Sequence, residues 1–452
     1  MSISKLLNIS QRSLFVYQKA LEVTSNNIAN ASDPNFSRQR VDFSALQANT
    51  AETLAVGDGV EISDIKRLRD QFTENQIIAY TQSDSYNEKK AELLSNLESV
   101  LSEPSDLGLS NLLGEFFNSW EELSVNPENA QLRTNVVQSA ENLSNKLKNI
   151  YDGFTTLRGD LEEQAVENVD LLNKYVSEIK TLNDEIFRLG VTDSNSNALL
   201  DRRDELILEL SNIANINVSY DSDNMANITI GGVYAVDRYY SAQFKVVEDN
   251  GNLSIQTVDG LSKLKLTKGS LGAIVETANT TIPGYLSYLD SMGNTIVENV
   301  NSIHESGYTN TEPPLTGIKF FDGYNKGNLV INSDIKSDVN FIATSADGTN
   351  GNNDIALQIA ELSNAKIING QSLVTSYSNF VSGIGNTISM CKLNNESNSL
   401  VLQQLEQQKS SYSGISLDEE MTNVLQFQKS YEAAAKLIKV ADELFEILLN
   451  AV

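Results

Sequence analysis

Apolar residues near the amino-terminal end recur at alternating intervals of four and three positions. This spacing places them on one face of a helix and is the heptad pattern of a coiled coil. The positions on this face are Ile3, Leu7, Ser10, Leu14, Tyr17, Leu21, Thr24 and Ile28. The pattern ends before Asp33-Pro34, because a residue that precedes proline disfavours helix. We therefore expect one amino-terminal helix with an apolar seam.

The same spacing returns at the carboxyl-terminal end of the chain. A helix is expected to begin at Ser416, since Ser416 and Glu419 form a capping-box pattern. Its seam positions are Leu417, Met421, Val424, Gln428, Tyr431, Ala435, Ile438, Asp442, Phe445, Leu449 and Val452. The last turns are apolar almost all round, with Leu444, Phe445, Ile447, Leu448 and Leu449. Such a surface is not stable in water on its own, so a partner must cover it.

The two ends also differ in charge. Residues 1–40 carry five basic side chains against two acidic ones, a net charge of +3. Residues 412–452 carry three lysines against seven acids, a net charge of −4. The charges favour pairing of the two helices, and the seams supply most of the affinity. We assign as candidate assembly seam the residues Ile3, Leu7, Leu14, Tyr17, Leu21, Ile28, Leu417, Met421, Val424, Tyr431, Ala435, Ile438, Phe445 and Leu449.

Between the ends, the pattern predicts more helix with β structure inserted. Residues 128–189 keep an apolar seam and should form a rod, in which Gly153 and Gly159 are candidate positions for a bend or a break. Residues 217–268 change to alternating β-branched and aromatic residues with turn signals such as Asp249-Asn250-Gly251. A second strand-rich stretch lies at about 317–345. The fold class predicted is mainly α with a small inserted β domain.

Composition excludes several classes of partner. The 452 residues carry 60 acidic and 33 basic side chains, a formal net charge of −27, which repels nucleic-acid backbones and anionic membranes. With 40% hydrophobic residues the chain can build two or three domains. One cysteine cannot form an intramolecular disulfide. The start of the chain has no apolar secretion signal and no stretch long enough for a membrane span, which by itself indicates a cytoplasmic protein.

Candidate catalytic chemistry is nearly absent. His304 is the only histidine, and we expect it on a helix as a surface or partly buried side chain without a catalytic role. The phosphate-binding glycine patterns are missing, and paired carboxylates carry little information in a chain with 60 acids. The loop Asp347–Asp354 is rich in oxygen ligands but lacks EF-hand spacing, so we interpret it as a solvated turn. No catalytic, metal or cofactor residue is assigned, and we expect no enzyme.

Two end motifs resemble those of flagellar rod, hook and hook-associated proteins. The amino-terminal motif is Ser25-Asn-Asn-Ile-Ala-Asn-Ala-Ser-Asp-Pro-Asn-Phe-Ser-Arg-Gln39, with Asn35 and Phe36 where the family usually has Gly and Tyr. The carboxyl-terminal motif includes Asp418-Glu-Glu420 and the run 425–435. Three further features resemble the hook-associated protein 1 family rather than hook protein or flagellin: Leu199-Leu-Asp-Arg-Arg-Asp-Glu-Leu206, Ile282–Asp290 with Asn301–His304, and the Asp-Glu-Glu form of the carboxyl-terminal motif.

The resemblance implies a domain organisation. Residues 1–40 and 414–452 would form a terminal coiled-coil domain that lines a tube, residues 41–216 and 269–413 an elongated helical domain outside it, and residues 217–268 an outer β domain. The chain is short for the family and is expected to lack the outermost domain.

The resemblance also implies partners and a location. The partners would be further copies of the chain in a ring, hook protein, the second junction protein (hook-associated protein 3) and a flagellar export chaperone. We assign the chaperone contact to Leu437, Ile438, Leu444, Phe445 and Leu448. Export through the flagellar type III route needs no cleaved signal, so the final location would be the extracellular flagellum.

Three alternatives stay open from the sequence. The nearest is another axial protein, such as hook protein or a rod component. An enzyme carried on an axial scaffold, such as a metalloprotease or muramidase, is a second, although HExxH is absent. A cytoplasmic coiled-coil scaffold fits the periodicity but leaves the paired end motifs unexplained.

Overall fold

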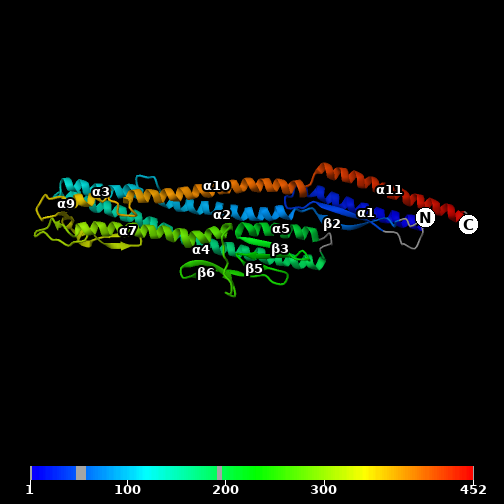
Figure 1. Ribbon diagram of the computed structural model, residues 1–452, viewed down its shortest axis with the longest axis horizontal. Coiled ribbons are helices and arrows are strands. Elements are labelled where there is room, and N and C mark those ends of the chain that lie inside the picture. The colour runs from blue at the N-terminus through cyan, green and yellow to red at the C-terminus, as the bar shows by residue number, and fades with distance from the viewer. Residues whose placement is uncertain (1–2, 47–56, 191–195, 451–452) are drawn as a thin grey trace.

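The computed structural model describes residues 3–46, 57–190 and 196–450, with the side chain of Leu448 left out. The molecule is a long rod of helices with a narrower unit at one end, where both chain ends lie (Figure 1). This arrangement confirms the predicted fold class, mainly α with small sheets.

The rod consists of helices that run along its length. They are α2 (Gln71–Leu101), α3 (Leu109–Val125), α4 (Ala130–Leu189), α5 (Ser196–Ile213), α6 (Gly269–Glu276), α7 (Ile282–His304), α9 (Asp354–Glu361) and α10 (Leu373–Ser413). A single apolar core extends through them, from Leu93 of α2 to Ile388 of α10. Because the heptad pattern of α4 buries one face continuously, including Leu143, Phe154 and Ile179, the helix needs no other support.

The two glycines of α4 do not interrupt it, so the expected break is absent. The helix continues over 60 residues. Gly153 faces α2, where an added Cβ would lie 2.6 Å from Val100 Cγ1. Glycine is therefore tolerated because it lets two helices approach closely.

The β structure decorates one side and the far end of the rod. Strands β3 (Ile216–Tyr220), β4 (Ala226–Ile230) and β5 (Val233–Val236) form an antiparallel sheet, and β6 (Phe244–Asp249) pairs with β7 (Asn252–Thr257). Asn250 and Gly251 both have positive φ, at 52° and 78°, which confirms the predicted hairpin turn. Near the far end lie β8 (Tyr308–Thr309), β9 (Phe321–Asn325), β10 (Asn328–Ile331), the short α8 (Ser333–Ser337) and β11 (Ala343–Ser345).

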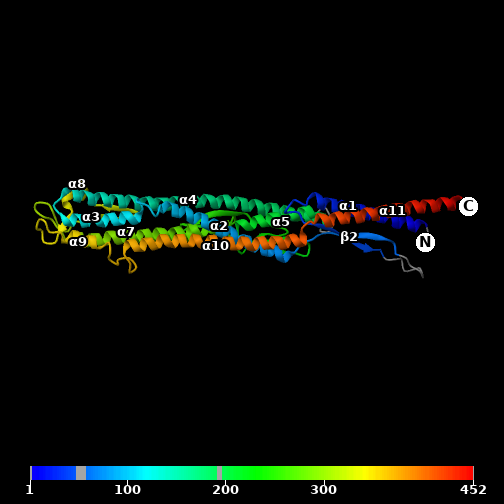
Figure 2. The same cartoon turned by 90° about the horizontal axis from the view of Figure 1, so that it is seen from above.

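The narrower unit contains the chain ends. Helices α1 (Ile3–Ala29) and α11 (Leu417–Asn450) lie side by side and run in opposite directions, so the two termini are close (Figure 1). A hairpin of β1 (Gln39–Ala45) and β2 (Val60–Arg67) lies beside them (Figure 2). The predicted helix start at Ser416 is confirmed, since Ser416 Oγ accepts the Glu419 N–H at 3.4 Å.

His304 is fully buried, so the expectation of a surface or partly buried side chain was wrong. Its Nδ1 lies 2.7 Å from the Ile318 carbonyl oxygen, and its Nε2 accepts the Ala343 N–H at 2.9 Å. The rings of Trp120 and Phe320 pack against it. Burial lowers the pKa of His304 to about 4, so the ring is neutral at pH 7 and joins α7 to two later segments.

Candidate assembly surface at the chain ends

The residues that α1 buries within the subunit are mostly small or polar, and of the large heptad residues Tyr17 packs against Phe427 of α11. The buried positions of α1 are Ser10, Val16, Ala20, Val23, Thr24 and Asn27. Ser10 and Thr24 each donate a hydroxyl hydrogen bond to the carbonyl four residues earlier, so their burial leaves no unsatisfied group. The candidate seam residues of α1 are only half-buried in the subunit: Ile3, Leu7, Leu14, Tyr17, Leu21 and Ile28.

Helix α11 presents one face to α1 and leaves another uncovered. The inward positions Glu420, Phe427, Ala434 and Ala441 recur every seven residues. Of the candidate seam, Val424 and Ile438 are half-buried. The others are exposed: Leu417, Met421, Tyr431, Ala435, Phe445 and Leu449. Within one subunit, eight of the fourteen candidate seam residues are therefore half-buried and six, all on α11, are exposed.

The uncovered surface of α11 is apolar over most of its length. Its exposed large apolar side chains are Leu417, Met421, Leu425, Tyr431, Leu437, Val440, Leu444, Phe445, Ile447 and Leu449. Phe445, for example, keeps 53% of its surface exposed to water. We name these residues the apolar stripe; they lie on more than one face of the helix, and exposed apolar surface of this extent is typical of a protein-binding surface. Three of the five residues assigned to the chaperone contact lie on it, namely Leu437, Leu444 and Phe445, whereas Ile438 is half-buried and the side chain of Leu448 lies outside the described part.

The core that holds this terminal unit together is small. It consists of Ala20, Val23 and Val41, with half-buried residues such as Ile62 and Phe427 around it. Tyr17, Phe43 and Phe427 add an aromatic cluster with ring centroids 6.0 to 6.4 Å apart. Such a core buries far less apolar surface than the rod does, so the terminal helices depend on additional contacts.

A polar node supplies part of that support. Asn27 Nδ2 donates to the Gln39 carbonyl at 2.8 Å and to Glu420 Oε2 at 3.1 Å, while Asn27 Oδ1 accepts the Gln39 N–H at 3.0 Å. Arg38 binds Glu420 Oε1 at 2.7 Å and Glu419 Oε2 at 2.8 Å. Glu420 is only 2% exposed. These five residues, the terminal node, connect α1, α11 and the start of β1, and all lie within the two end motifs.

A second charged cluster lies where the terminal unit meets the rod. Arg67 Nη1 lies 2.6 Å from Asp201 Oδ1 and 2.9 Å from Asp204 Oδ2. Arg69 Nη1 lies 2.7 Å from Asp204 Oδ2 and also pairs with Glu74. Burial raises the pKa of Asp201 although Arg67 opposes this. Burial alone would lower the pKa of Arg69, but the charges of Asp204 and Glu74 outweigh burial and raise it.

The sequence analysis named the motif 199–206 that holds these acids but assigned it no role. Arg67 and Asp201 are 134 positions apart. An ion pair between residues so far apart in the sequence leaves no recognisable sequence pattern in a chain with so many charged residues. The available signal was the clustering of five basic residues at 66–69 and 202–203 beside acids in an acidic chain.

The described residues provide neither a metal-binding cluster nor a helix suited to span a membrane. The described residues contain no group of three or more His, Cys, Asp or Glu side chains placed to bind a metal ion. In the loop 347–354, Asp347 Oδ1 accepts hydrogen bonds from Ser345 Oγ and from Thr349 N and Oγ1, which lower its pKa. Within residues 3–46, 57–190 and 196–450, none of the helices combines the length and apolar character that a membrane span requires.

A long helical rod, paired terminal helices and an unpartnered apolar stripe define a structural subunit that assembles with other chains. Comparison with known proteins identifies its class. Residues 94–321 match the family model described as flagellar hook-associated protein FlgK helical domain, and residues 406–451 match the flagellar basal body rod FlgEFG protein C-terminal model. The chain therefore belongs to the flagellar hook-associated protein FlgK family, as the end motifs together with the three further features predicted, and is a structural protein of the hook–filament junction of the bacterial flagellum.

Relatives match over nearly the whole chain. Flagellar hook-associated protein 1 of Bacillus subtilis (strain 168) is 29% identical, over 98% of this chain and 97% of the relative. The protein of that name from Escherichia coli (strain K12) is 26% identical, over 99% of this chain and 100% of the relative. The latter alignment extends over 546 positions against 452 residues here, so the relative carries additional residues, in agreement with the expectation of a short chain.

The fold also has a solved counterpart. The structure of the flagellar hook junction protein FlgK from Burkholderia pseudomallei superposes with a TM-score of 0.64 at 15% sequence identity. It covers 75% of this chain and all of that chain. This likeness supports the mainly helical fold and agrees with the family match.

Proposed function

We propose that the chain is a non-catalytic ring subunit that joins hook to filament, and that filament growth depends on the ring. In this proposal the terminal helices form the wall of an inner tube, in which the apolar stripe of α11 packs against neighbouring copies. The observation that carries the proposal is that stripe, because its exposed side chains have no partner within the subunit.

We further propose the domain partition and the seam. Residues 1–40 and 414–452 form the tube domain, residues 41–216 and 269–413 the rod, and residues 217–268 the outer β domain. The small core at Ala20, Val23 and Val41 is separate from the core of the rod and supports a distinct terminal domain, but it also includes the β1–β2 hairpin, which this partition assigns to the rod. The half-buried seam residues of α1 and the exposed ones of α11 are the proposed contacts between copies: Ile3, Leu7, Leu14, Tyr17, Leu21, Ile28, Leu417, Met421, Val424, Tyr431, Ala435, Ile438, Phe445 and Leu449.

The proposed partners are copies of this chain, hook protein, hook-associated protein 3 and an export chaperone. Membership of the FlgK family supports contacts with axial proteins on both sides of the junction. Export without a cleaved signal and a final extracellular location belong to the same proposal.

Phe445→Asp tests the inter-subunit role of the stripe. Burying Phe445 against a neighbour is worth about 1.5 to 3 kcal/mol, and an unpaired carboxylate buried there costs several more. Cells with this variant should form hooks that lack filaments and release flagellin into the medium, while the pure subunit keeps its melting temperature. Asn450→Asp is the control, since it adds the same charge at a polar exposed site on the same helix. Full-length filaments on Phe445→Asp cells with stable exported protein would contradict the proposal.

Removal of residues 437–452 tests the chaperone contact. An apolar stripe must be shielded before export, and its densest part lies in this segment. The shortened chain should lose binding to the flagellar export chaperone in calorimetry, whereas Met421→Ala, on the same stripe before that segment, should bind normally. Unchanged affinity after the truncation would place the chaperone site elsewhere.

A further inference from the structure

The terminal unit and the rod meet through a joint that has no apolar core of its own. The chain crosses it twice, at residues 68–70 between β2 and α2 and at residues 414–416 between α10 and α11. Within the described ranges, the apolar cluster of the rod and that of the terminal unit remain separate. Elements joined by a large apolar interface move little, so a joint without one is free to bend unless other contacts hold it.

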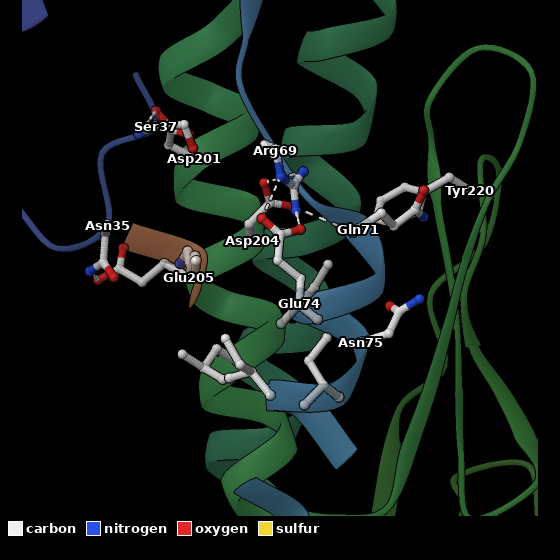
Figure 3. Close-up of a pocket in the computed structure, with 15 residues that line it drawn as sticks. Asn35, Ser37, Arg69, Gln71, Glu74, Asn75, Asp201, Asp204, Glu205 and Tyr220 are labelled. Carbon is white, nitrogen blue, oxygen red and sulfur yellow. Dashed lines mark hydrogen bonds and ion pairs between the residues drawn. The ribbon is translucent and has the colours of Figure 1, made fainter. Parts of the chain in front are cut away.

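Most of the contacts that hold it converge on the first half of α5, and one more joins the Arg38 N–H to the Ser413 carbonyl of α10 at 3.3 Å. From the terminal unit, Arg67 reaches Asp201 and Asp204. The Ser37 N–H donates to Asp201 Oδ2 at 3.4 Å, and Asn35 Nδ2 donates to Glu205 Oε1 at 3.1 Å. Figure 3 shows Asn35 beside Glu205 and Ser37 beside Asp201, on the side of α5 that faces the loop before β1. All of these bonds are polar, and water can replace them when the joint opens.

The position of the bend follows from Arg69. Its two partners, Glu74 of α2 and Asp204 of α5, both belong to the rod (Figure 3). Arg67, two residues earlier, is the last residue of β2 and belongs to the terminal unit. Only Leu68 separates the two arginines, so rotation about Leu68 breaks the bonds of Arg67 and leaves those of Arg69 intact.

The rod side of the joint is firmly held. Arg203 of α5 is fully buried, and its Nη1 donates to Asn183 Oδ1 of α4 at 3.2 Å and to the Asn224 carbonyl at 2.7 Å. Its guanidinium also lies over the ring of Tyr220, 5.1 Å from the centroid. Helix α5 is thus fixed to α4 and to the β3–β4 turn, and it offers Asp201 and Asp204 as stationary acceptors.

Space for movement surrounds the contacts. A cavity of about 60 Å³ lies between Ser37, Arg69 and Asp204. A groove of about 610 Å³ opens on the side of α1, and another of about 390 Å³ opens beside β2. Protein cores are close-packed, so hollows on three sides of one helix mark a place where rotation meets little steric resistance.

We propose that this joint is a hinge at Leu68 and residues 414–416, and that Arg67 with Asp201 and Asp204 is the latch that fixes its angle. Because the bonds of Arg67 are short and directional, they select one orientation of the terminal helices. When they break, the same chain can present its tube domain at a different angle to the rod. The latch acts within one subunit, so it stands independently of the proposed packing of α11 in a ring.

Distance measurement across the hinge in the isolated subunit tests the latch. Spin labels are placed at Ser63→Cys on β2 and Ser177→Cys on α4, both exposed, with Cys391→Ala to remove the native thiol. Double electron–electron resonance should give one narrow distance peak for the otherwise wild-type chain. Arg67→Gln should replace it by a broad distribution, while the melting temperature of the rod stays unchanged.

Two further variants make the result decisive. Arg238→Gln is the matched control, because Arg238 pairs with Asp223 at 3.0 Å, both residues lie on the rod side of the joint, and neither is among the contacts of the joint. It should keep the narrow peak. Asp201→Asn, an isosteric change, should broaden it as Arg67→Gln does. The proposal is overturned if the unmodified joint already gives a broad distribution, or if both latch variants keep the narrow one.

Discussion

Replacing Asn27 with Asp should release α11 from α1 and leave cells with hooks that carry no filament. The new carboxylate would stand where Asn27 Nδ2 now lies 3.1 Å from Glu420 Oε2, so two negative charges would share a buried site. The Gln39 carbonyl would also lose its donor. Disrupting a buried charged network in this way typically costs about 3 to 5 kcal/mol. The small core of the terminal unit cannot offset such a loss.

Hydrogen exchange measures this effect directly in the pure subunit. Amides of α1 and α11 should exchange much faster in Asn27→Asp, while those of α4 and α7 stay protected, because the rod has its own core. Adding Glu420→Gln should restore part of the protection, since positions 27 and 420 then again carry one carboxylate and one amide beside Arg38. Normal exchange and normal filaments in the single variant would show that the terminal node does not position α11.

Acid should destabilise the rod through His304. Its pKa is near 6.5 when unfolded and about 4 when folded, so between these values the unfolded chain binds the additional proton. The contribution of the neutral ring to stability is fully present above pH 6.5 and is lost as the pH falls towards 4. A difference of this size corresponds to about 3 kcal/mol. Arg133, the charged neighbour of the ring, opposes protonation further.

Urea unfolding at several pH values measures the contribution of His304 to the free energy of unfolding. His304→Gln retains a donor for the Ile318 carbonyl and an acceptor for the Ala343 N–H, but it does not titrate. The wild-type chain should lose roughly 3 kcal/mol more than this variant between pH 7 and pH 4, because carboxylates that titrate in the same range act equally on both. Parallel stability curves for the two proteins would show that His304 binds its proton equally well in the folded and unfolded states.

Local patterns in the sequence predicted the elements well. The helices α1, α4 and α11 and the Asn250-Gly251 turn appear in the structure where the sequence placed them, because each depends on residues that are close in the chain. Which residues α1 and α11 bury within the subunit was predicted less well. Ala20 and Ala434 are buried but were not assigned to the seam, because a pattern based on large apolar residues gives alanine little weight.

Long-range polar contacts were beyond the sequence analysis. Asn27 and Glu420 are 393 positions apart and meet only because the chain returns along α10. Asp201 was one of many acids until the fold placed Arg67 beside it. His304 is buried because Trp120, Phe320 and Ala343 arrive from three other segments, and its own helix gives no sign of them.

The length of α4 gives the joint mechanical leverage. At about 1.5 Å per residue, its 60 residues span roughly 90 Å, with one end beside the joint and the other near the far end of the rod. Treated as a rigid arm of that length, the rod converts a rotation of about 5° at the joint into a displacement of roughly 8 Å at its tip. The same arm works in reverse, so a modest sideways load on the tip is delivered to the joint as a large torque. The stiffness of a ring built from such subunits is then governed less by the bundle than by the few side chains at its base.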